Sequence, residues 1–141
     1  MSKITVIGSF VMDNVAKMER FPKAGESIIG YSLECFPGGK GANQCVAVAR
    51  LGGDVEMIGM LGKDENAVVF RKIFQEEGIK IDNVFSCEKP TAVAQIQINA
   101  EGQNRICVIL SANYEFGFEE LDKIDSVYQP APPRVSIHQR T

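Results

Sequence analysis

The sequence predicts an α/β fold in which a parallel, doubly wound sheet carries a small additional β layer. Short apolar runs at 4–7, 55–61 and 79–85 have the length and composition of buried strands. Helical patterns at 41–50 and 64–77 separate these runs. Strands that alternate with helices in this way usually pair in parallel, because each helix returns the chain across a face of the sheet.

The N-terminal part of the chain supplies the first sheet strand and then leaves the predicted core. Residues 4–7 form an apolar run that ends at Gly8. Residues 10–37 are mixed, with turn signals around Pro22 and Gly25, and their apolar and polar residues alternate only in part. We expect this segment to form short exposed strands outside the sheet core.

Two helices are predicted between the sheet strands. The first, 41–50, is stopped by the glycine pair at 52–53. The second, 64–77, begins with an acidic turn and is stopped by Gly78. We expect the apolar face of this second helix to consist of Val68, Val69, Ile73 and Phe74.

A hairpin is predicted in the second half of the chain. Segments 91–98 and 105–110 have the composition of strands, and they flank a polar turn at 99–103. A further helix is expected at 118–125. Together with the exposed strands in 10–37, the hairpin would form the β layer on top of the sheet.

A glycine-rich turn at 38–43, with the sequence Gly-Gly-Lys-Gly-Ala-Asn, leads directly into the first helix. Glycines let the backbone approach a ligand, and the first N–H groups of a helix lack internal partners. Asp13 lies in the loop after the first strand, which is expected at the same edge of the sheet. Asp13, Lys40 and Asn43 would together form a set of donors and acceptors suited to hydroxyl groups.

Each of these features also has a plain structural interpretation. The glycine-rich segment can simply turn the chain, and Asp13 and Lys40 can be solvated surface charges. The turn does not match two common nucleotide motifs, because the third glycine of G-x-G-x-x-G is missing and no Gly-Lys-Ser/Thr follows. Dinucleotide and P-loop chemistry are therefore disfavoured.

Composition and charge exclude several classes of function. The net charge of -3 is spread without a basic run, which argues against nucleic acid or an anionic membrane as partner. No window of about 18 apolar residues occurs, and the N-terminus lacks the pattern of a signal peptide, so we expect a cytoplasmic protein. The four cysteines show no C-x-x-C spacing, and the single histidine is His138. Buried free thiols and no metal site are expected.

These motifs, in this order, resemble the N-terminal part of the ribokinase-like, or PfkB, family of carbohydrate kinases. The turn at 38–43 corresponds to the start of the family's first signature, with Gly52 at the signature spacing. Residues 21–26, Phe-Pro-Lys-Ala-Gly-Glu, are similar to the family's F-P-x-x-G-E, and residues 62–64 to its G-x-D. The resemblance covers about residues 3–125. It implies a ribokinase-like, Rossmann-like doubly wound sheet with a small β lid.

The resemblance also implies a sugar site. It assigns Asp13 to the sugar hydroxyls, residues 39–43 to the opposite wall, and Ala94 and Val108 to apolar lid contacts. One position departs from the family, because Val11 stands where ribokinases commonly have an asparagine, so one hydroxyl contact is missing or made by the backbone. The predicted substrate-binding residues are Asp13, Gly39, Lys40, Gly41, Ala42, Asn43, Ala94 and Val108.

The activity that the resemblance implies is ATP-dependent phosphorylation of a sugar hydroxyl, with conversion of D-ribose to ribose 5-phosphate as the nearest reaction. ATP and Mg²⁺ are the implied cofactors, a monovalent cation is a further candidate in full-length members, and a homodimer through the β lid is the implied assembly. The second half of family members carries Asp-Thr-x-Gly-Ala-Gly-Asp, whose last aspartate is the general base. Nothing in this chain resembles that segment. We therefore expect residues 1–125 to be the truncated sugar-binding and lid half, without a catalytic residue and inactive alone.

Residues 126–141 depart from the family pattern. Prolines at 130, 132 and 133 cannot sit in a central strand, so we expect an extended or disordered appendage, produced by a shifted reading frame or an artificial truncation. A proline-rich docking peptide is the alternative for this tail. For the chain as a whole, the alternative to a sugar kinase is a non-catalytic module that binds sugar or pairs through the lid.

Overall fold

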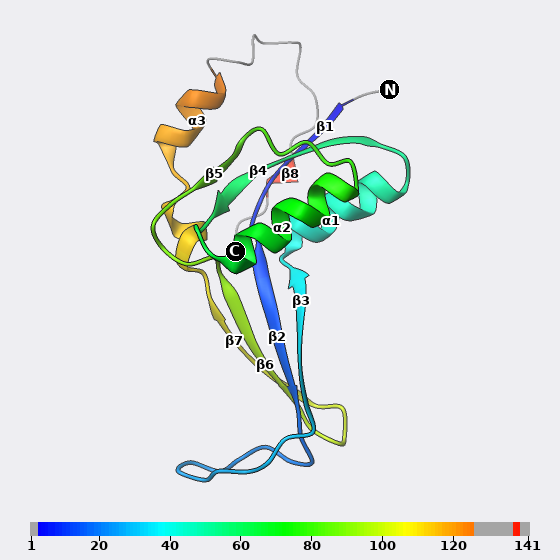
Figure 1. The fold of residues 1–141 in the computed structure, drawn as a ribbon, viewed down its shortest axis with the longest axis vertical. Helices are drawn as coiled ribbons and strands as arrows, with labels where there is room; N and C mark the ends of the chain where they lie inside the picture. The colour runs from blue at the N-terminus through cyan, green and yellow to red at the C-terminus, as the bar shows by residue number, and fades with distance from the viewer. Residues whose placement is uncertain (1–2, 126–136, 139–141) are drawn as a thin grey trace.

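The computed structural model of the chain describes residues 3–125 and 137–138. It has two parts, a sheet covered by helices and an elongated lid that projects from one end of the sheet (Figure 1). The predicted alternation of strands and helices in the first part is confirmed, and so is the additional β layer.

The first part is built on a parallel sheet. Its elements are β1 (Lys3–Ile7), β4 (Asp54–Leu61), β5 (Val84–Ser86), β8 (Ile137–His138), α1 (Lys40–Arg50) and α2 (Glu65–Glu76). The strand order is β5-β4-β1-β8, and β1 pairs with β4 along its whole length. Helices α1 and α2 lie over the same face of this sheet (Figure 1).

The hydrophobic core lies between the sheet and these two helices. The ring centroid of Phe10 is 5.1 Å from that of Phe70 and 5.4 Å from that of Phe74, and all three side chains are buried. Val55 and Met57 of β4 belong to the same cluster. Because burying a ring of this kind contributes roughly 1.5–3 kcal/mol, the cluster anchors the segment around Phe10 that follows β1.

The lid is a mixed sheet of four strands with the order β3-β2-β6-β7. Its strands are β2 (Val11–Lys17), β3 (Ser32–Gly38), β6 (Val93–Ile98) and β7 (Asn104–Ile109). The antiparallel pairs β2–β3 and β6–β7 agree with the expected exposed strands and hairpin. The parallel pair β2–β6, which joins them, was not predicted, because the pattern of a strand does not reveal a distant partner.

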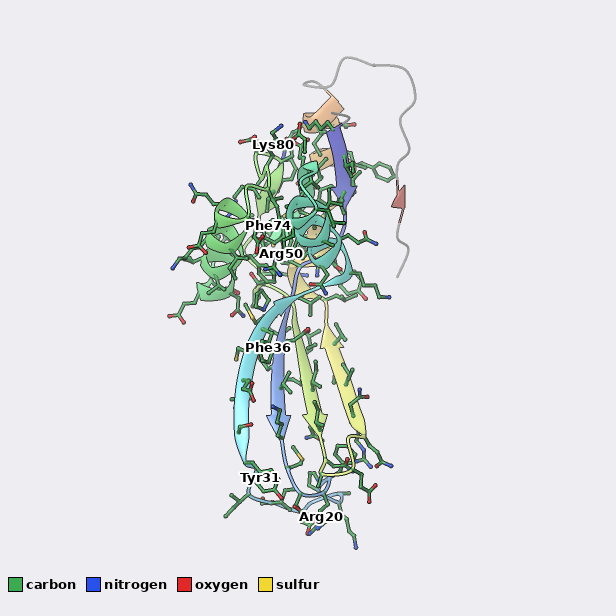
Figure 2. All side chains as sticks on the ribbon, turned by 90° about the vertical axis from the view of Figure 1, so that its right-hand side faces the viewer. Arg20, Tyr31, Phe36, Arg50, Phe74 and Lys80 are labelled. Carbon is green, nitrogen blue, oxygen red and sulfur yellow. The ribbon has the colours of Figure 1, made fainter. Side chains whose placement is uncertain are left out.

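Two short helices follow the lid. They are η1 (Ser111–Glu115) and α3 (Phe118–Asp125), and α3 has the predicted bounds. Figure 2 shows how the two parts differ in packing, with Phe74 among crowded side chains near the helices and Phe36 on the thin lid. The lid thus has only a small core of its own, formed by Val11, Ala92 and Ala94.

Helix α2 buries a face that agrees only in part with the one predicted, since Phe74 is buried and Ile73 packs against the core as expected. Val68 and Val69 are 67% and 40% exposed, whereas Ala67, Phe70 and Phe74 are buried. The three buried residues are spaced i, i+3 and i+7, which places them on one stripe of a helix. The prediction was wrong for the two valines because it assigned neighbouring apolar residues to one buried face, although consecutive residues of a helix point in different directions.

The third predicted sheet strand, 79–85, forms only near its end. Lys80 makes a single parallel bridge with Glu56, and the regular pairing of β5 begins later. Between them the Val84 amide donates to the Ile81 carbonyl at 3.0 Å, which turns the chain. A turn within the apolar run therefore shortens the strand.

The predicted proline-rich stretch lies outside the described residues. Residues 137–138 of the expected appendage pair in parallel with Val6 and Ile7 of β1, so this part of the tail extends the sheet. Strand β1 is also less buried than its apolar run suggested, since Ile4 and Ile7 are each 39% exposed.

Candidate functional site

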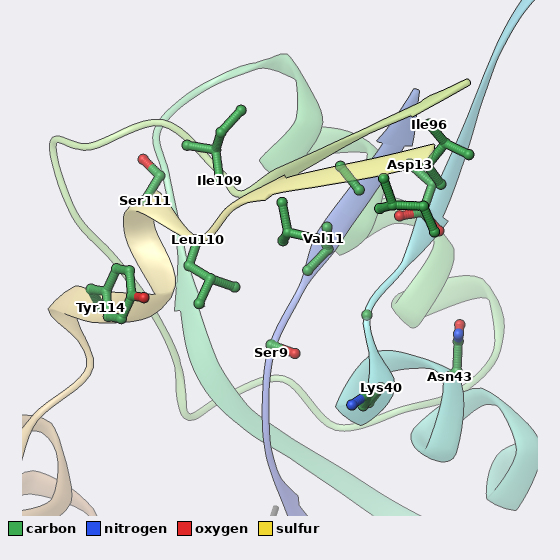
Figure 3. A pocket seen from close by; sticks show the side chains of 14 residues that line it. Ser9, Val11, Asp13, Lys40, Asn43, Ile96, Ile109, Leu110, Ser111 and Tyr114 are labelled. Atoms are coloured by element: carbon green, nitrogen blue, oxygen red, sulfur yellow. The ribbon is translucent and has the colours of Figure 1, made fainter. Parts of the chain in front are cut away.

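A pocket of about 720 Å³ lies where the parallel sheet meets the lid. Its wall comes from the segment after β1, the start of α1, the lid strands β2, β6 and β7, and η1 (Figure 3). The volume is within the usual range for small-molecule sites. The pocket also has the expected location, because ligands of open α/β sheets bind beyond the carboxyl ends of the strands.

Asp13 projects from β2 into this pocket (Figure 3). Its carboxylate makes no hydrogen bond or ion pair with any residue that the structure describes. Burial raises the pKa of Asp13 above its ordinary value. Because a partly desolvated carboxylate without a partner is costly, its oxygens are poised to accept hydrogen bonds from a ligand.

Lys40 and Asn43 line the same pocket from the first turn of α1. Within the described part of the chain, neither side chain has a hydrogen-bond or ion-pair partner. The predicted convergence of Asp13 and Asn43 on one concave surface is therefore confirmed. A carboxylate, an ammonium and an amide face a single space, and together they can serve several hydroxyl groups.

Gly39 brings the start of α1 close to the segment after β1. It has φ 97° and ψ 138°, a conformation that glycine adopts far more readily than other residues. A Cβ atom on Gly39 would lie 2.6 Å from the Ser9 carbonyl oxygen and 2.9 Å from the Val11 nitrogen. The Ala42 amide also donates to the Ser9 carbonyl at 3.3 Å. The glycine therefore lets helix and loop share one wall of the pocket.

Two of the predicted contact residues lie behind that wall. A Cβ atom on Gly41 would lie 2.8 Å from Gly8 Cα, so this glycine permits close packing of α1 on the end of β1. Ala42 is buried in the hydrophobic core. Neither residue lines the pocket, whose α1 wall is formed by Gly39, Lys40 and Asn43.

The lid supplies an apolar wall. The predicted residues Ala94 and Val108 line the pocket and lie opposite each other on β6 and β7. The next pair on the same face, Ile96 and Ile106, lines it as well, although the sequence interpretation missed both. A period of two along each strand is the signal that could have found them.

The remaining wall follows β7 and includes Leu110, Ser111 and Tyr114 (Figure 3). Ser111 has φ 38°, a left-handed conformation that is uncommon for a residue other than glycine. The sequence did not point to Tyr114, because a single exposed aromatic residue in a short helix carries no pattern. The side chains of Ser111 and Tyr114, at and after this backbone turn, both line the pocket.

The cysteines lie apart from this chemistry. The cysteines are free, as expected, but only Cys45 is buried, and burial raises its pKa to about 12. The expectation of buried thiols was wrong for Cys35 and Cys107, because the two sit on lid strands that solvent reaches.

Among the described residues, no three or more His, Cys, Asp or Glu side chains could together hold a metal ion. In that same part of the chain, no helix is long and apolar enough to cross a membrane.

Comparison with known proteins decides the family. The family model of pfkB family carbohydrate kinases matches residues 1–133. This chain belongs to the pfkB family. Two curated relatives of this pfkB chain are named ribokinase. The protein of Lactococcus lactis subsp. lactis (strain IL1403) is 43% identical over 116 residues, which cover 82% of this chain and 38% of the relative. The protein of Bacillus subtilis (strain 168) is 37% identical over 134 residues, or 90% of this chain and 46% of the relative.

A solved structure shows the same relationship. Ribokinase from Arabidopsis thaliana, complexed with ribose and ATP, matches 79% of this pfkB chain with a TM-score of 0.73 and 32% identity. The match covers 36% of that protein. The ribokinase-like fold is thereby confirmed, and the chain spans less than half the length of these relatives.

Proposed function

We propose that the pocket binds a sugar and that the chain supplies the sugar-binding and lid half of a ribokinase-type kinase. Such an enzyme transfers a phosphoryl group from ATP to a sugar hydroxyl. The observation that carries the proposal is the convergence of Asp13, Lys40 and Asn43 on one pocket beneath an apolar lid. None of these three side chains has a partner among the described residues that would compete with a ligand.

D-Ribose is the substrate that we propose, with ribose 5-phosphate as the product. The name ribokinase in both curated relatives supports this choice, and so does the ribose in the Arabidopsis structure. The pocket suits a sugar because one side offers donors and acceptors and the other offers apolar side chains. Val11, which stands where ribokinases commonly have an asparagine, lines the pocket next to Asp13. At this position the chain therefore offers the sugar an apolar side chain in place of an amide.

Each polar residue has a distinct part in this proposal. Asp13 accepts hydrogen bonds from neighbouring hydroxyl groups, while the Lys40 ammonium and the Asn43 amide donate to sugar oxygens. The apolar lid residues Ala94 and Val108 cover the C–H face of the ring and exclude water. These contacts fix the orientation of the sugar, and positioning is a large share of catalysis in phosphoryl transfer.

The nucleotide half of the reaction does not map onto the described residues. ATP would supply the phosphoryl group, and Mg²⁺ would neutralise charge on its phosphates. The described residues lack a grouping of side chains that fits a metal ion, and no segment of the sequence resembles the family's anion-hole motif. We propose that this chain alone binds sugar without phosphorylating it.

A second proposal concerns the pocket-facing side of the lid, which stays partly exposed. Phe36, Ile106 and Val108 lie on this face and are each about half exposed. Exposed apolar surface of this kind favours association. We propose that a second copy of the chain covers this apolar face, which would give a homodimer through the lid. The same pairing is what the alternative function, a non-catalytic module that dimerises through the lid, would require.

Calorimetric titration with D-ribose tests the sugar site. The parent chain should bind, and Asp13→Asn and Asn43→Ala should each weaken binding at least tenfold, about 1.4 kcal/mol. Asn99→Ala is a matched control, since Asn99 forms its side-chain hydrogen bonds within the lid turn. A coupled assay for ADP release should show no turnover by the chain alone. Absence of binding by the folded parent would refute the sugar site.

A further inference from the structure

The side chain of Asn113 holds the backbone of Phe10 by both of its polar groups. Asn113 Nδ2 donates to the Phe10 carbonyl at 2.8 Å, and the Phe10 amide donates to Asn113 Oδ1 at 3.2 Å. The two residues are 103 positions apart in the sequence. An exchange of two hydrogen bonds with one residue is what a neighbouring antiparallel strand would provide.

This contact fills a gap between the two sheets. The Gly8 amide donates to the Ile58 carbonyl of β4 at 3.1 Å, and the Met12 amide donates to the Ala92 carbonyl beside β6 at 2.8 Å. Between them the backbone passes from the parallel sheet into the lid, and Phe10 belongs to no strand. The Asn113 amide therefore continues the hydrogen bonding at the junction itself.

Both ends of the contact lie next to the pocket. Ser9 and Val11, on either side of Phe10, line it, and so do Ser111 and Tyr114, which flank Asn113 (Figure 3). The Phe10 ring is fixed in the core against Phe70 and Phe74. Phe10, which is anchored in the core between two residues that line the pocket, thus holds the neighbouring η1 wall through the single side chain of Asn113.

The segment that carries Asn113 has other ties, including an ion pair between Glu115 and Lys89 at 2.7 Å. The Ala112 amide donates to the Pro90 carbonyl at 3.0 Å, and the Asn113 amide donates to the Leu110 carbonyl at 2.8 Å. The first bond links two chain segments that both leave the lid base, and the second closes a local turn. Neither bond connects this segment to the loop between β1 and β2, which the Asn113 side chain does.

We propose that Asn113 is a positioning residue that sets the angle of the lid over the pocket. Its amide ties residues 110–114, where the chain leaves the lid after β7, to residues 9–11, where the chain enters the lid at β2, so the base of the lid is held to the anchored Phe10. This inference concerns the geometry of the free chain and does not depend on which ligand the pocket takes. Asn113→Ala removes both hydrogen bonds, while Asn113→Asp keeps the acceptor and sets a carboxylate oxygen against the Phe10 carbonyl.

Spin-label distances between lid and sheet test the proposal directly. One label is attached to Cys107, which is exposed on β7, and the other to a cysteine introduced by Gln75→Cys on the exposed side of α2. Cys35→Ser and Cys87→Ser remove the other accessible thiols, so that only these two positions are labelled. The parent should give a narrow distance distribution. Asn113→Ala and Asn113→Asp should each widen it at least twofold, and the control Asn99→Ala should leave it unchanged.

Two further readouts separate positioning from loss of fold. Urea unfolding identifies a variant that fails to fold, and amide hydrogen exchange of the parent requires no substitution, since the Phe10 amide should be protected like the amides of β4. D-Ribose affinity should fall at least tenfold in Asn113→Ala and stay unchanged in Asn99→Ala. If the parent binds no ribose, the proposed sugar site is refuted, but the spin-label distances still test whether Asn113 positions the lid. An unchanged distribution in both folded variants, or a Phe10 amide that exchanges as fast as the turn amide of Gly102, would overturn it.

Discussion

Asp64 binds Thr91 through two hydrogen bonds while it caps helix α2. Thr91 Oγ1 donates to Asp64 Oδ1 and the Thr91 amide donates to Asp64 Oδ2, both at 2.7 Å, and the Ala67 amide donates to Oδ1 at 3.0 Å. The Gly62 amide in turn donates to Thr91 Oγ1 at 3.0 Å. One carboxylate thus joins the end of β4, the start of α2 and the segment that enters the lid, which gives the G-x-D motif a structural role.

Asp64→Ala should lower the free energy of unfolding by about 2–4 kcal/mol. Loss of an N-cap costs about 1 kcal/mol, and the Thr91 groups left without a partner cost about 1–3 kcal/mol more. Urea denaturation measures the change. The control Asp54→Ala should cost less than about 1 kcal/mol, because its partner Lys80 is exposed. Equal losses for the two variants would contradict the role assigned to Asp64.

Asp13→Asn should weaken sugar binding at least tenfold without destabilising the fold at neutral pH. Burial raises the pKa of Asp13, so the folded state favours the protonated form. The stability that this preference contributes is fully present below the unfolded pKa of about 3.9 and is lost as pH rises through the higher folded pKa. Urea denaturation across this window should show the variant gaining stability relative to the parent as pH rises. A variant that loses stability toward pH 7 would refute this account of Asp13.

Gly39→Ala should destabilise the chain more than Gly52→Ala. Both glycines have positive φ, 97° and 81°, so each substitution carries a strain of about 1–2 kcal/mol. A Cβ on Gly39 would also meet the Ser9 carbonyl oxygen, whereas nothing lies within 4 Å of a Cβ on Gly52. Thermal or urea unfolding of both variants measures the difference. Equal destabilisation would show that the wall near Gly39 yields to the added methyl group.

Ile106→Asp should convert a dimer into a monomer if the lid pairs through its pocket-facing side. The substitution places a charge on the apolar face proposed to meet a second copy, and burying that charge without a partner is costly. Leu33→Asp is the matched control, since Leu33 is exposed on the opposite side of the same sheet. Sedimentation velocity measures both. A parent that is monomeric, or a control that dissociates equally, would exclude the proposed lid dimer.

Much of the fold could be predicted because its signals are local. Apolar runs predicted the strands β1 and β4, and glycines at the expected ends predicted the helices α1 and α2. The prediction failed where distant partners decide the outcome. The parallel pair of β2 and β6 has no local signal, and the valines of α2 face solvent because spacing on the helix, rather than hydrophobicity alone, selects Phe70 and Phe74.

The candidate site divides in the same way. Asp13, Lys40 and Asn43 were predicted from their motifs, and the pocket brings them together, although Asp13 lies on strand β2 and not in the predicted loop. Ile96 and Tyr114 were missed, since their place in the pocket depends on the register of the lid and on the turn at Ser111. Gly41 and Ala42 do not line the pocket, because they lie on the side of the first turn of α1 that packs against β1 and the core, whereas Lys40 and Asn43 lie on the side that faces the pocket.

Amide chemical shifts of the isotopically labelled chain during titration with D-ribose test the central claim most directly. The sugar-site account predicts saturable shifts at Asp13, Gly39, Asn43 and Ala94, with no change in the lid turn around Gly102. Saturable shifts confined to other parts of the folded chain, or none at all, would contradict the claim that this pocket is a sugar site.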